Sequence, residues 1–286
     1  MNQAKEKKVK SHAVDLLWTG GWDSTFRLLD LVIHLKKNVR PHYIVCSTRR
    51  TLKVELKTMV EIMTKIQEDH PESANLVQPV HLSLKYNIPE DLSITKKYEN
   101  LSARVHFGPQ YEYLARYAKY HPSVKLEIGL QHKNFADRFD LFTRGRVRLN
   151  SNDPDYQFWE LVDVDPEEDV SILTPFRFPI WRTPKLQMKA VAEEYGFLDI
   201  LEMSWTCQRP MKGKPCGICT PCVVALREGM QYRFPRSAVL RNKIMYDPLP
   251  REIRYFLQYI HRALKKMFNH ASSQSNDKKE TPNESS

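Results

Sequence analysis

Four of the five cysteines in this chain follow the spacing C-x8-C-x2-C-x2-C within residues 207–222. Two-residue gaps let successive thiolates point at one centre, and the Gly and Pro residues of the stretch CGICTPC suit a tight turn. Four thiolates around one tetrahedral ion leave no open coordination position, so we expect a structural zinc site rather than a catalytic one. An iron–sulfur cluster and a redox-active pair are the alternatives. The expected ligands are Cys207, Cys216, Cys219 and Cys222.

A second candidate site lies in the stretch VDLLWTGGWDST, residues 14–25, where a glycine pair follows a short apolar run. A tight strand–loop–helix junction points backbone N–H groups and the positive end of a helix dipole at one place, which favours an anion such as phosphate. Glycine allows the backbone to approach the anion closely. Asp23 is a candidate magnesium ligand, and the hydroxyls of Ser24 and Thr25 are candidate donors to phosphate or helix caps. Neither G-x-x-x-x-G-K-[ST] nor G-x-G-x-x-G is present, and a plain Gly-Gly turn is the alternative.

Strands and helices that would position these motifs alternate along the chain. Short apolar runs predict strands, and apolar residues at helical spacing predict helices. Gly196 is expected to end the helix that precedes the cysteines. The alternation predicts an α/β fold with a parallel sheet and crossover helices. The expected strands are 13–18, 42–47, 78–84 and 124–131, and the expected helices are 24–37, 52–67, 111–121, 186–197 and 250–270.

Composition divides the chain into four parts. The parts are a disordered basic lead-in (1–11), a main domain (12–235) that contains the metal segment (205–225), a C-terminal helical extension (236–270) and a disordered tail (271–286). The tail lacks residues that could form a core. The acidic stretch DVDPEEDV, residues 163–170, is expected to be a solvated loop rather than a metal site.

The overall composition predicts a cytoplasmic protein that does not enter a membrane. Hydrophobic residues make up 41% and charged residues 27% of the chain, which is ordinary for a soluble protein. No run approaches the roughly 18 apolar residues of a membrane span, and the first residues lack the apolar segment of a secretory signal. The formal net charge of +10 suggests an anionic partner such as a nucleotide or RNA, although solvated helix faces would also account for it.

The stretch TGGWDST resembles the S-G-G-x-D-S-T signature of the PP-loop ATP pyrophosphatases, with Thr19 in place of the leading serine. Combined with the cysteine spacing, the resemblance narrows to the 7-cyano-7-deazaguanine synthase (QueC) family. The stretch SWTCQRPMKGKPCGICTPC resembles the zinc segment of that family. The stretch TPFRFPIWRTPKLQMKAVAEEYGF resembles its T-P-L-x-x-x-S-K-x-E-I segment, which places Lys185 at the family lysine. The resemblance covers roughly residues 12 to 230.

The resemblance implies a HUP/Rossmann-like PP-loop fold and an ATP-dependent carbon–nitrogen ligase of queuosine and 7-deazaguanine biosynthesis, often a homodimer. Such an enzyme uses ATP and Mg²⁺ to adenylate 7-carboxy-7-deazaguanine, releases pyrophosphate, and forms the amide with ammonia and then the nitrile. It implies catalytic roles for Asp23, Ser24 and Lys185. The ATP-binding residues that it implies are Trp18, Thr19, Gly20, Gly21, Trp22, Asp23, Ser24 and Thr25.

The middle of the chain departs from that family where substrate recognition is expected. The family stretches P-G-R-N and D-Y-S-G-Y-P-D correspond to LSARVHFGPQYEYL and IGLQHKNFADRFDLF here. Two alternatives therefore stay open: a related enzyme that transfers the acyl group to a protein or nucleic-acid amine, and an inactive zinc-stabilised protein that binds ATP and RNA. In either, the basic C-terminal helix is a candidate contact for protein or RNA. The expected substrate residues are Arg104, Gln131, Asn134, Asp137 and Arg138.

Overall fold

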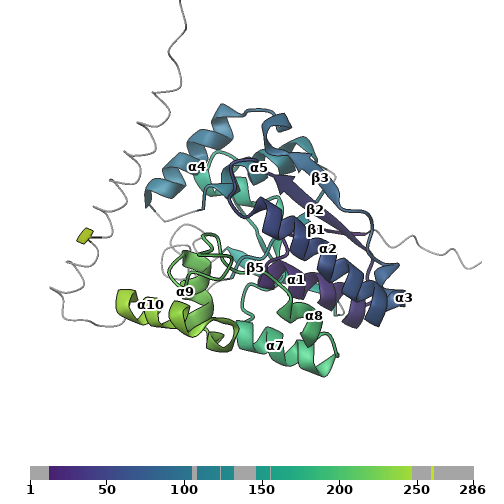
Figure 1. The fold of residues 1–286 in the computed structure, drawn as a ribbon. Helices are drawn as coiled ribbons and strands as arrows, with labels where there is room; N and C mark the ends of the chain where they lie inside the picture. The colour runs from purple at the N-terminus through teal and green to yellow at the C-terminus, as the bar shows by residue number, and fades with distance from the viewer. Residues whose placement is uncertain are drawn as a thin grey trace, which may run out of the picture.

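A mostly parallel seven-stranded sheet forms the centre of the computed structural model, which describes residues 13–104, 108–122, 124–131, 146–154, 156–246 and 259–260 (Figure 1). The strand order is β3-β2-β1-β4-β7-β6-β5. β1, β2, β3, β4 and β7 run parallel, whereas β6 is antiparallel to both β7 and β5. The strands are β1 (Val14–Leu17), β2 (Val39–Val45), β3 (His81–Leu84), β4 (Leu126–Glu127), β5 (Val147–Asp153), β6 (Tyr156–Leu161) and β7 (Phe176–Phe178).

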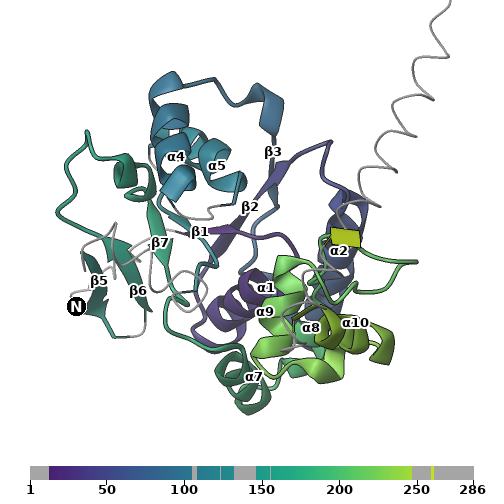
Figure 2. The ribbon, with the colours of Figure 1, turned by 90° about the vertical axis from the view of Figure 1, so that its left-hand side faces the viewer.

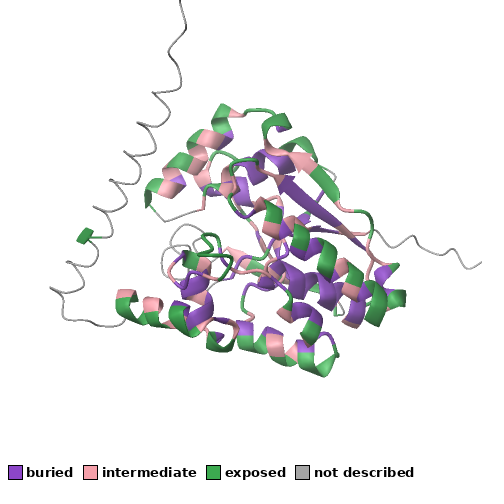
Figure 3. Ribbon diagram, viewed as in Figure 1, coloured by how far each residue is buried: buried purple, intermediate pink, exposed green. Residues whose placement is uncertain are grey.

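Helices cover both faces of the sheet (Figure 2). α4 and α5 lie on one face, and α1, α2, α7, α8 and α9 lie on the other, so that each face packs against its own apolar cluster. Buried residues concentrate in the strands and in the sides of helices that face them (Figure 3). The α-helices are α1 (Trp22–Leu29), α2 (Leu52–Asp69), α3 (Pro71–Ala74), α4 (Leu92–Arg104), α5 (Gln110–Tyr120), α7 (Lys185–Glu194), α8 (Leu198–Glu202), α9 (Thr220–Arg227) and α10 (Arg236–Tyr246).

Short turns of other helical types connect these elements. η1 (Asp30–His34) is a π-helical turn that continues α1. At its end the N–H of Leu35 donates to the carbonyl of Asp30 at 2.9 Å. η2 (Lys85–Asn87), η4 (Asp169–Leu173) and η5 (Gln231–Arg233) are 3₁₀ turns. None of the described helices is both long enough and apolar enough to cross a membrane.

The α/β class expected from the sequence is confirmed, but the sheet is not wholly parallel. The hairpin of β5 and β6 and the short strand β7 had no predicted counterpart, and the hairpin adds the antiparallel edge. The expected strand 124–131 pairs only at Leu126–Glu127, and its remaining residues form a loop. Of the expected helix 250–270 the structure describes residues 259–260 alone, and the expected lead-in 1–11 and tail 271–286 lie outside the described residues.

Gly196 ends α7 as expected. Its φ of +71° is left-handed, the N–H of Phe197 binds the carbonyl of Ala192 at 2.9 Å, and the N–H of Gly196 binds that of Glu193 at 3.3 Å. This pair of bonds is the Schellman arrangement, which satisfies carbonyls at the end of a helix. The chain then turns at once into α8.

A buried ion pair joins α1 to β4. The guanidinium of Arg27 donates to Glu127 at 2.8 and 3.1 Å and to Asp30 at 2.8 Å, and the hydroxyl of Tyr156 donates to Glu127 at 2.7 Å. Burial by itself lowers the pKa of Arg27, but the two carboxylates raise it overall. The Glu127 side chain is fully buried, so its charge depends on these partners.

We expect Arg27→Met to lower the free energy of unfolding by about 3–5 kcal/mol, because it leaves the Glu127 carboxylate buried without its counter-charge. Denaturant unfolding measures the loss. The double variant Arg27→Met/Glu127→Gln should recover much of it, since the fully buried charge of Glu127 is gone and Asp30 keeps its contact with His34. A loss below about 1 kcal/mol in the single variant would contradict this account.

Candidate functional site

The candidate site lies where the chain reverses its direction of travel across the sheet. After β1 the chain builds β2 and β3 on one side, and it returns to place β4 on the other side of β1. Ligands of open α/β sheets bind in the crevice outside the carboxyl ends of the strands at such a switch point. The loop at Trp18–Gly21 and the loop at Ile128–Gln131 both leave the sheet here.

The two glycines of the first loop meet different constraints. Gly20 has a φ of +68°, and a Cβ on it would lie 3.3 Å from atoms of Glu55, Thr58 and Met59 in α2. Gly21 is extended (φ −79°) and caps α1, and a Cβ there would make only ordinary contacts at 3.5 Å or more. The fold therefore requires glycine at position 20, whereas packing gives no reason for glycine at position 21.

Hydroxyl groups close the loop on itself. The N–H of Thr19 donates to Ser24 Oγ at 3.3 Å, and Ser24 Oγ lies 3.3 Å from the carbonyl of Gly21. Trp18 and Thr25 are fully buried beneath the loop and share a hydrogen bond of 3.1 Å between Nε1 and Oγ1. Trp18 and Thr25, both expected to bind ATP, are therefore buried residues that support the loop.

Lys185 reaches Asp23 from the far end of the sequence. The Lys185 Nζ lies 2.5 Å from Asp23 Oδ1 and donates to Gln131 Oε1 at 3.2 Å, while Gln131 Nε2 donates to the Thr183 carbonyl at 2.7 Å. The Lys185 side chain is 5% exposed and that of Asp23 is 30% exposed, so the carboxylate is the part of the pair that faces solvent. Three of the residues predicted from the sequence are thus brought together.

The second loop approaches Asp23 closely. A Cβ on Gly129 would lie 3.0 Å from the Asp23 Cβ and 3.6 Å from the Ser24 nitrogen, so a larger residue would push the two loops apart. Tyr111, at the start of α5, lies close enough to Asp23 for the two side chains to interact electrostatically. Burial raises the pKa of Tyr111 to about 12, and the Asp23 carboxylate acts in the same direction.

The other residues expected to contact substrate are not placed in this cluster. Arg104 is the last residue of α4, and its Nη2 lies 3.3 Å from Asp169 Oδ2 of η4. Asn134, Asp137 and Arg138 lie outside the described residues. Glu168, within the stretch expected to be a solvated acidic loop, pairs with Arg146 at 2.7 Å.

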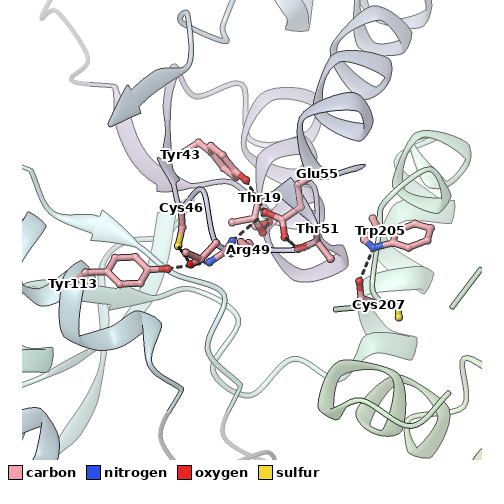
Figure 4. Close-up of polar contacts among 11 residues, drawn as sticks. Thr19, Tyr43, Cys46, Arg49, Thr51, Glu55, Tyr113, Trp205 and Cys207 are labelled. Atoms are coloured by element: carbon pink, nitrogen blue, oxygen red, sulfur yellow. Dashed lines mark hydrogen bonds and ion pairs between the residues drawn. The ribbon is translucent and has the colours of Figure 1, made fainter. Parts of the chain in front are cut away.

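A polar network beside the loop had no predicted counterpart. Glu55 of α2 accepts from the Tyr43 hydroxyl at 2.8 Å and from Arg49 Nη1 at 3.0 Å, and Arg49 Nη2 donates to the Tyr113 hydroxyl at 2.9 Å (Figure 4). These residues join the carboxyl end of β2 to α2 and α5. The stretch that contains Arg49 matches no motif. The one signal in the sequence for a role of Arg49 was its position just after a predicted strand.

Cys46 belongs to the expected strand 42–47, but it follows β2 instead of lying inside it, and it is only partly buried. Partial burial opposes ionisation of its thiol, but a hydrogen bond with Thr48 at 3.2 Å and the nearby cations Lys85 and Arg49 lower its pKa.

The four clustered cysteines form the second half of the site. All four are buried, and their sulfurs lie within 4.8 Å of one another. Three of the S···S distances are 3.3, 3.9 and 4.0 Å, whereas sulfurs bound tetrahedrally to zinc at about 2.3 Å lie about 3.8 Å apart. The backbone N–H groups of Arg209 and Cys216 donate to Cys207 Sγ, and those of Ile218 and Cys219 donate to Cys216 Sγ, each at 3.3 or 3.4 Å. The cluster could therefore hold a metal ion such as zinc.

The electrostatics of the cluster favour a cation. Hydrogen bonding from the Cys222 thiol lowers the pKa of Cys219 to about 4, whereas that same contact, with burial, raises the pKa of Cys222. Burial raises the pKa of Cys207 to about 11. One thiolate thus forms readily, and its negative charge opposes ionisation of the other thiols. A divalent cation bound among them would remove this repulsion.

Trp205 connects the cysteine segment to the glycine loop. Its backbone N–H donates to the Gly20 carbonyl at 2.8 Å, and its indole Nε1 donates to the Cys207 carbonyl at 2.6 Å (Figure 4). Arg233 adds a second connection, because it binds the Ser204 carbonyl at 2.7 Å and lies over the Trp22 ring at 4.6 Å. The chain before Cys207 therefore forms one wall of the loop.

α10 packs against the cysteine turn. A Cβ on Gly217 would lie 2.1 Å from the Ala238 carbonyl oxygen, so glycine is required there. Arg241 Nε donates to the Cys216 carbonyl at 2.9 Å, and Asn242 Nδ2 donates to that of Gly217 at 2.7 Å. These contacts cross the boundary that was expected between residues 235 and 236.

A scan of the chain against models of known protein families and a search of curated proteins both give no match.

We expect Gly20→Ala to lower the free energy of unfolding by about 1–2 kcal/mol, because an alanine there adopts the left-handed region and meets α2. Gly21→Ala is the matched control and should change it by no more than about 0.5 kcal/mol. Thermal or denaturant unfolding compares the two. Equal losses would contradict the distinct roles given to these glycines.

We expect the purified chain to contain zinc and Cys219→Ser to lose it, with a fall in melting temperature, because a hydroxyl replaces one thiolate of the four. Elemental analysis and thermal unfolding provide the measurements. Cys46→Ser, which alters the cysteine outside the cluster, should keep both the metal and the melting temperature. A Cys219→Ser protein that kept both would refute the four-cysteine assignment.

Proposed function

We propose that this chain is an ATP-dependent adenylating enzyme of the PP-loop pyrophosphatase type, and that its reaction is the conversion of 7-carboxy-7-deazaguanine to 7-cyano-7-deazaguanine. One observation carries the proposal: the Asp23–Lys185 pair stands at the mouth of a glycine loop, at the switch point of the sheet, with the cysteine cluster fixed to the same loop. The resemblance of TGGWDST and of the cysteine segment to the synthase family supports the choice of reaction.

The residues present fit a polyphosphate with its cation. Gly21 caps α1 without a side chain at the N-terminus of the helix, where backbone N–H groups and the helix dipole favour negative charge. Ser24 and Thr19 add hydroxyls at the same place. Asp23 is the carboxylate suited to hold Mg²⁺, which would neutralise charge on the phosphates.

In the structure, the charges of Asp23 and Lys185 neutralise each other. With Mg²⁺–ATP bound, Asp23 would hold the cation and Lys185 would contact phosphate oxygens. The buried ammonium of Lys185 would thus stay paired, and Gln131 Oε1, which lies 3.2 Å from Lys185 Nζ, would orient it. Lys185 thereby places positive charge where negative charge develops as pyrophosphate leaves.

The proposed reaction has two rounds. In the first, a carboxylate oxygen attacks the α-phosphorus of ATP and pyrophosphate leaves; ammonia then attacks the acyl carbon, and AMP and a proton leave to give the amide. In the second, the amide oxygen attacks the α-phosphorus of another ATP and a second pyrophosphate leaves; loss of AMP and of both amide N–H protons then gives the nitrile. The four-cysteine centre takes no part in these steps, because a site with four thiolates has no open position.

Mass spectrometry of a reaction with ATP, Mg²⁺, ammonium and 7-carboxy-7-deazaguanine tests the proposal. We expect the nitrile, AMP and pyrophosphate. Lys185→Gln should lower kcat at least about a hundredfold, because it removes one charge that stabilises the transition state. Lys189→Gln, which changes a partly exposed lysine of the same helix that pairs with Glu193, is the matched control and should retain the wild-type kcat.

Other outcomes decide between the remaining candidates. Pyrophosphate release without the nitrile would indicate a different acyl substrate or a protein or nucleic-acid amine as acceptor. ATP binding without pyrophosphate release under all these conditions would indicate the inactive binding protein and would refute the enzyme.

A further inference from the structure

The positive charge of the chain is concentrated around the cysteine cluster. Residues 204–246 hold eight of the lysines and arginines but only one carboxylate, Glu228, so this segment carries +7 of the formal net charge of +10. Such asymmetry along a chain points to a polyanionic partner. Solvated helix faces would account for the net charge of the whole chain, whereas the charge of this segment gathers in one structural unit.

Most of these cations are exposed and lack a carboxylate partner. Arg233 pairs with Glu202, and Arg241 binds backbone carbonyls. Within the part of the chain that the structure describes, the other six have no carboxylate at ion-pair distance, and each is exposed. They are Arg209, Lys212, Lys214, Arg227, Arg236 and Lys243.

Three of the six stand on an exposed turn rooted in the cysteine cluster. Met211 and Lys214 exchange both backbone hydrogen bonds, at 2.9 and 3.1 Å, so residues 208–214 form a tight hairpin, here called the basic hairpin. Lys212 and Gly213 both have positive φ, 49° and 72°, which is the geometry of a two-residue hairpin turn. Every residue of the hairpin is exposed, and N–H bonds to Cys207 Sγ fix its base on both sides.

α10 and η5 extend this surface with a groove that combines charge and aromatic area. Arg236 and Lys243 line the groove together with Tyr232 and Leu240, which are 52% and 59% exposed. The Tyr232 hydroxyl donates to Glu202 at 2.7 Å, so the ring is held in place. Arg241 connects α10 to the base of the basic hairpin through the carbonyls of Pro215 and Cys216.

We infer that the basic hairpin and the groove of α10 form a surface that binds single-stranded nucleic acid through its phosphate backbone. Exposed lysine and arginine without carboxylate partners attract a chain of phosphates, and an exposed, fixed tyrosine ring offers a platform on which a base can stack. Hydrogen bonds attach both the basic hairpin and α10 to the cysteine segment, which fixes the spacing between their cations. This inference is independent of the proposed reaction.

The test measures binding of the full chain to a fluorescent single-stranded RNA of mixed sequence, by anisotropy, from 50 to 200 mM salt. We expect binding whose affinity falls steeply with salt. The variant Lys212→Gln/Lys214→Gln/Arg236→Gln/Lys243→Gln should bind at least about tenfold more weakly at low salt, because each phosphate contact contributes about 0.7 to the salt slope. A single-stranded DNA of the same sequence distinguishes recognition of ribose from recognition of the backbone alone.

A matched control removes four exposed lysines elsewhere: Lys53→Gln/Lys57→Gln/Lys96→Gln/Lys125→Gln. It changes the net charge equally, so it should keep the wild-type affinity and salt slope if the surface is specific. Equal weakening in both variants would overturn the inference, as would absence of RNA binding at 50 mM salt. Binding to anionic phospholipid vesicles that only the first variant loses, with RNA binding unaltered, would assign the surface to a membrane and overturn it too.

Discussion

The hydrogen bond from the backbone N–H of Trp205 to the carbonyl of Gly20 holds the two halves of the site together. Gly20 is already confined by its left-handed backbone and by α2, and this bond adds a third restraint on the loop. Trp205 is held in turn by its indole bond to the carbonyl of Cys207. The order of the glycine loop therefore depends on a segment that lies almost two hundred residues away in the sequence.

That segment has few other means of folding. Between Cys207 and Cys216 the chain is exposed and polar, and it buries no apolar side chain of its own. Four thiolates on one ion would replace the missing core, as they do in small metal-dependent domains. A structural metal would then also affect the shape of the loop at Asp23, because Trp205 is hydrogen-bonded both to Cys207 of the cluster and to Gly20 of the loop.

The sequence predicted the elements with strong periodicity and the sites with short-range motifs. β1, β2, α2, α5 and α7 follow apolar patterns, and the cysteine spacing by itself brought four sulfurs together. The β5–β6 hairpin was missed because β5 alternates weakly and exposes most of its residues. β7 was missed because three residues flanked by prolines and turns give no periodicity.

Long-range contacts explain what local patterns could not supply. Lys185 and Gln131 were placed in the site only by a resemblance, because nothing in a single helix start or a strand end reveals a partner that is 162 residues distant. Gly129 carried a signal, a glycine inside the expected strand 124–131, whose meaning depends on the approach of Asp23. Trp205 carried none for its contact with Gly20, since that contact uses a backbone N–H that any residue except proline provides. The contact most important for the shape of the loop is thus the one that residue type encodes least, and only the arrangement of the sheet and the cysteine segment reveals it.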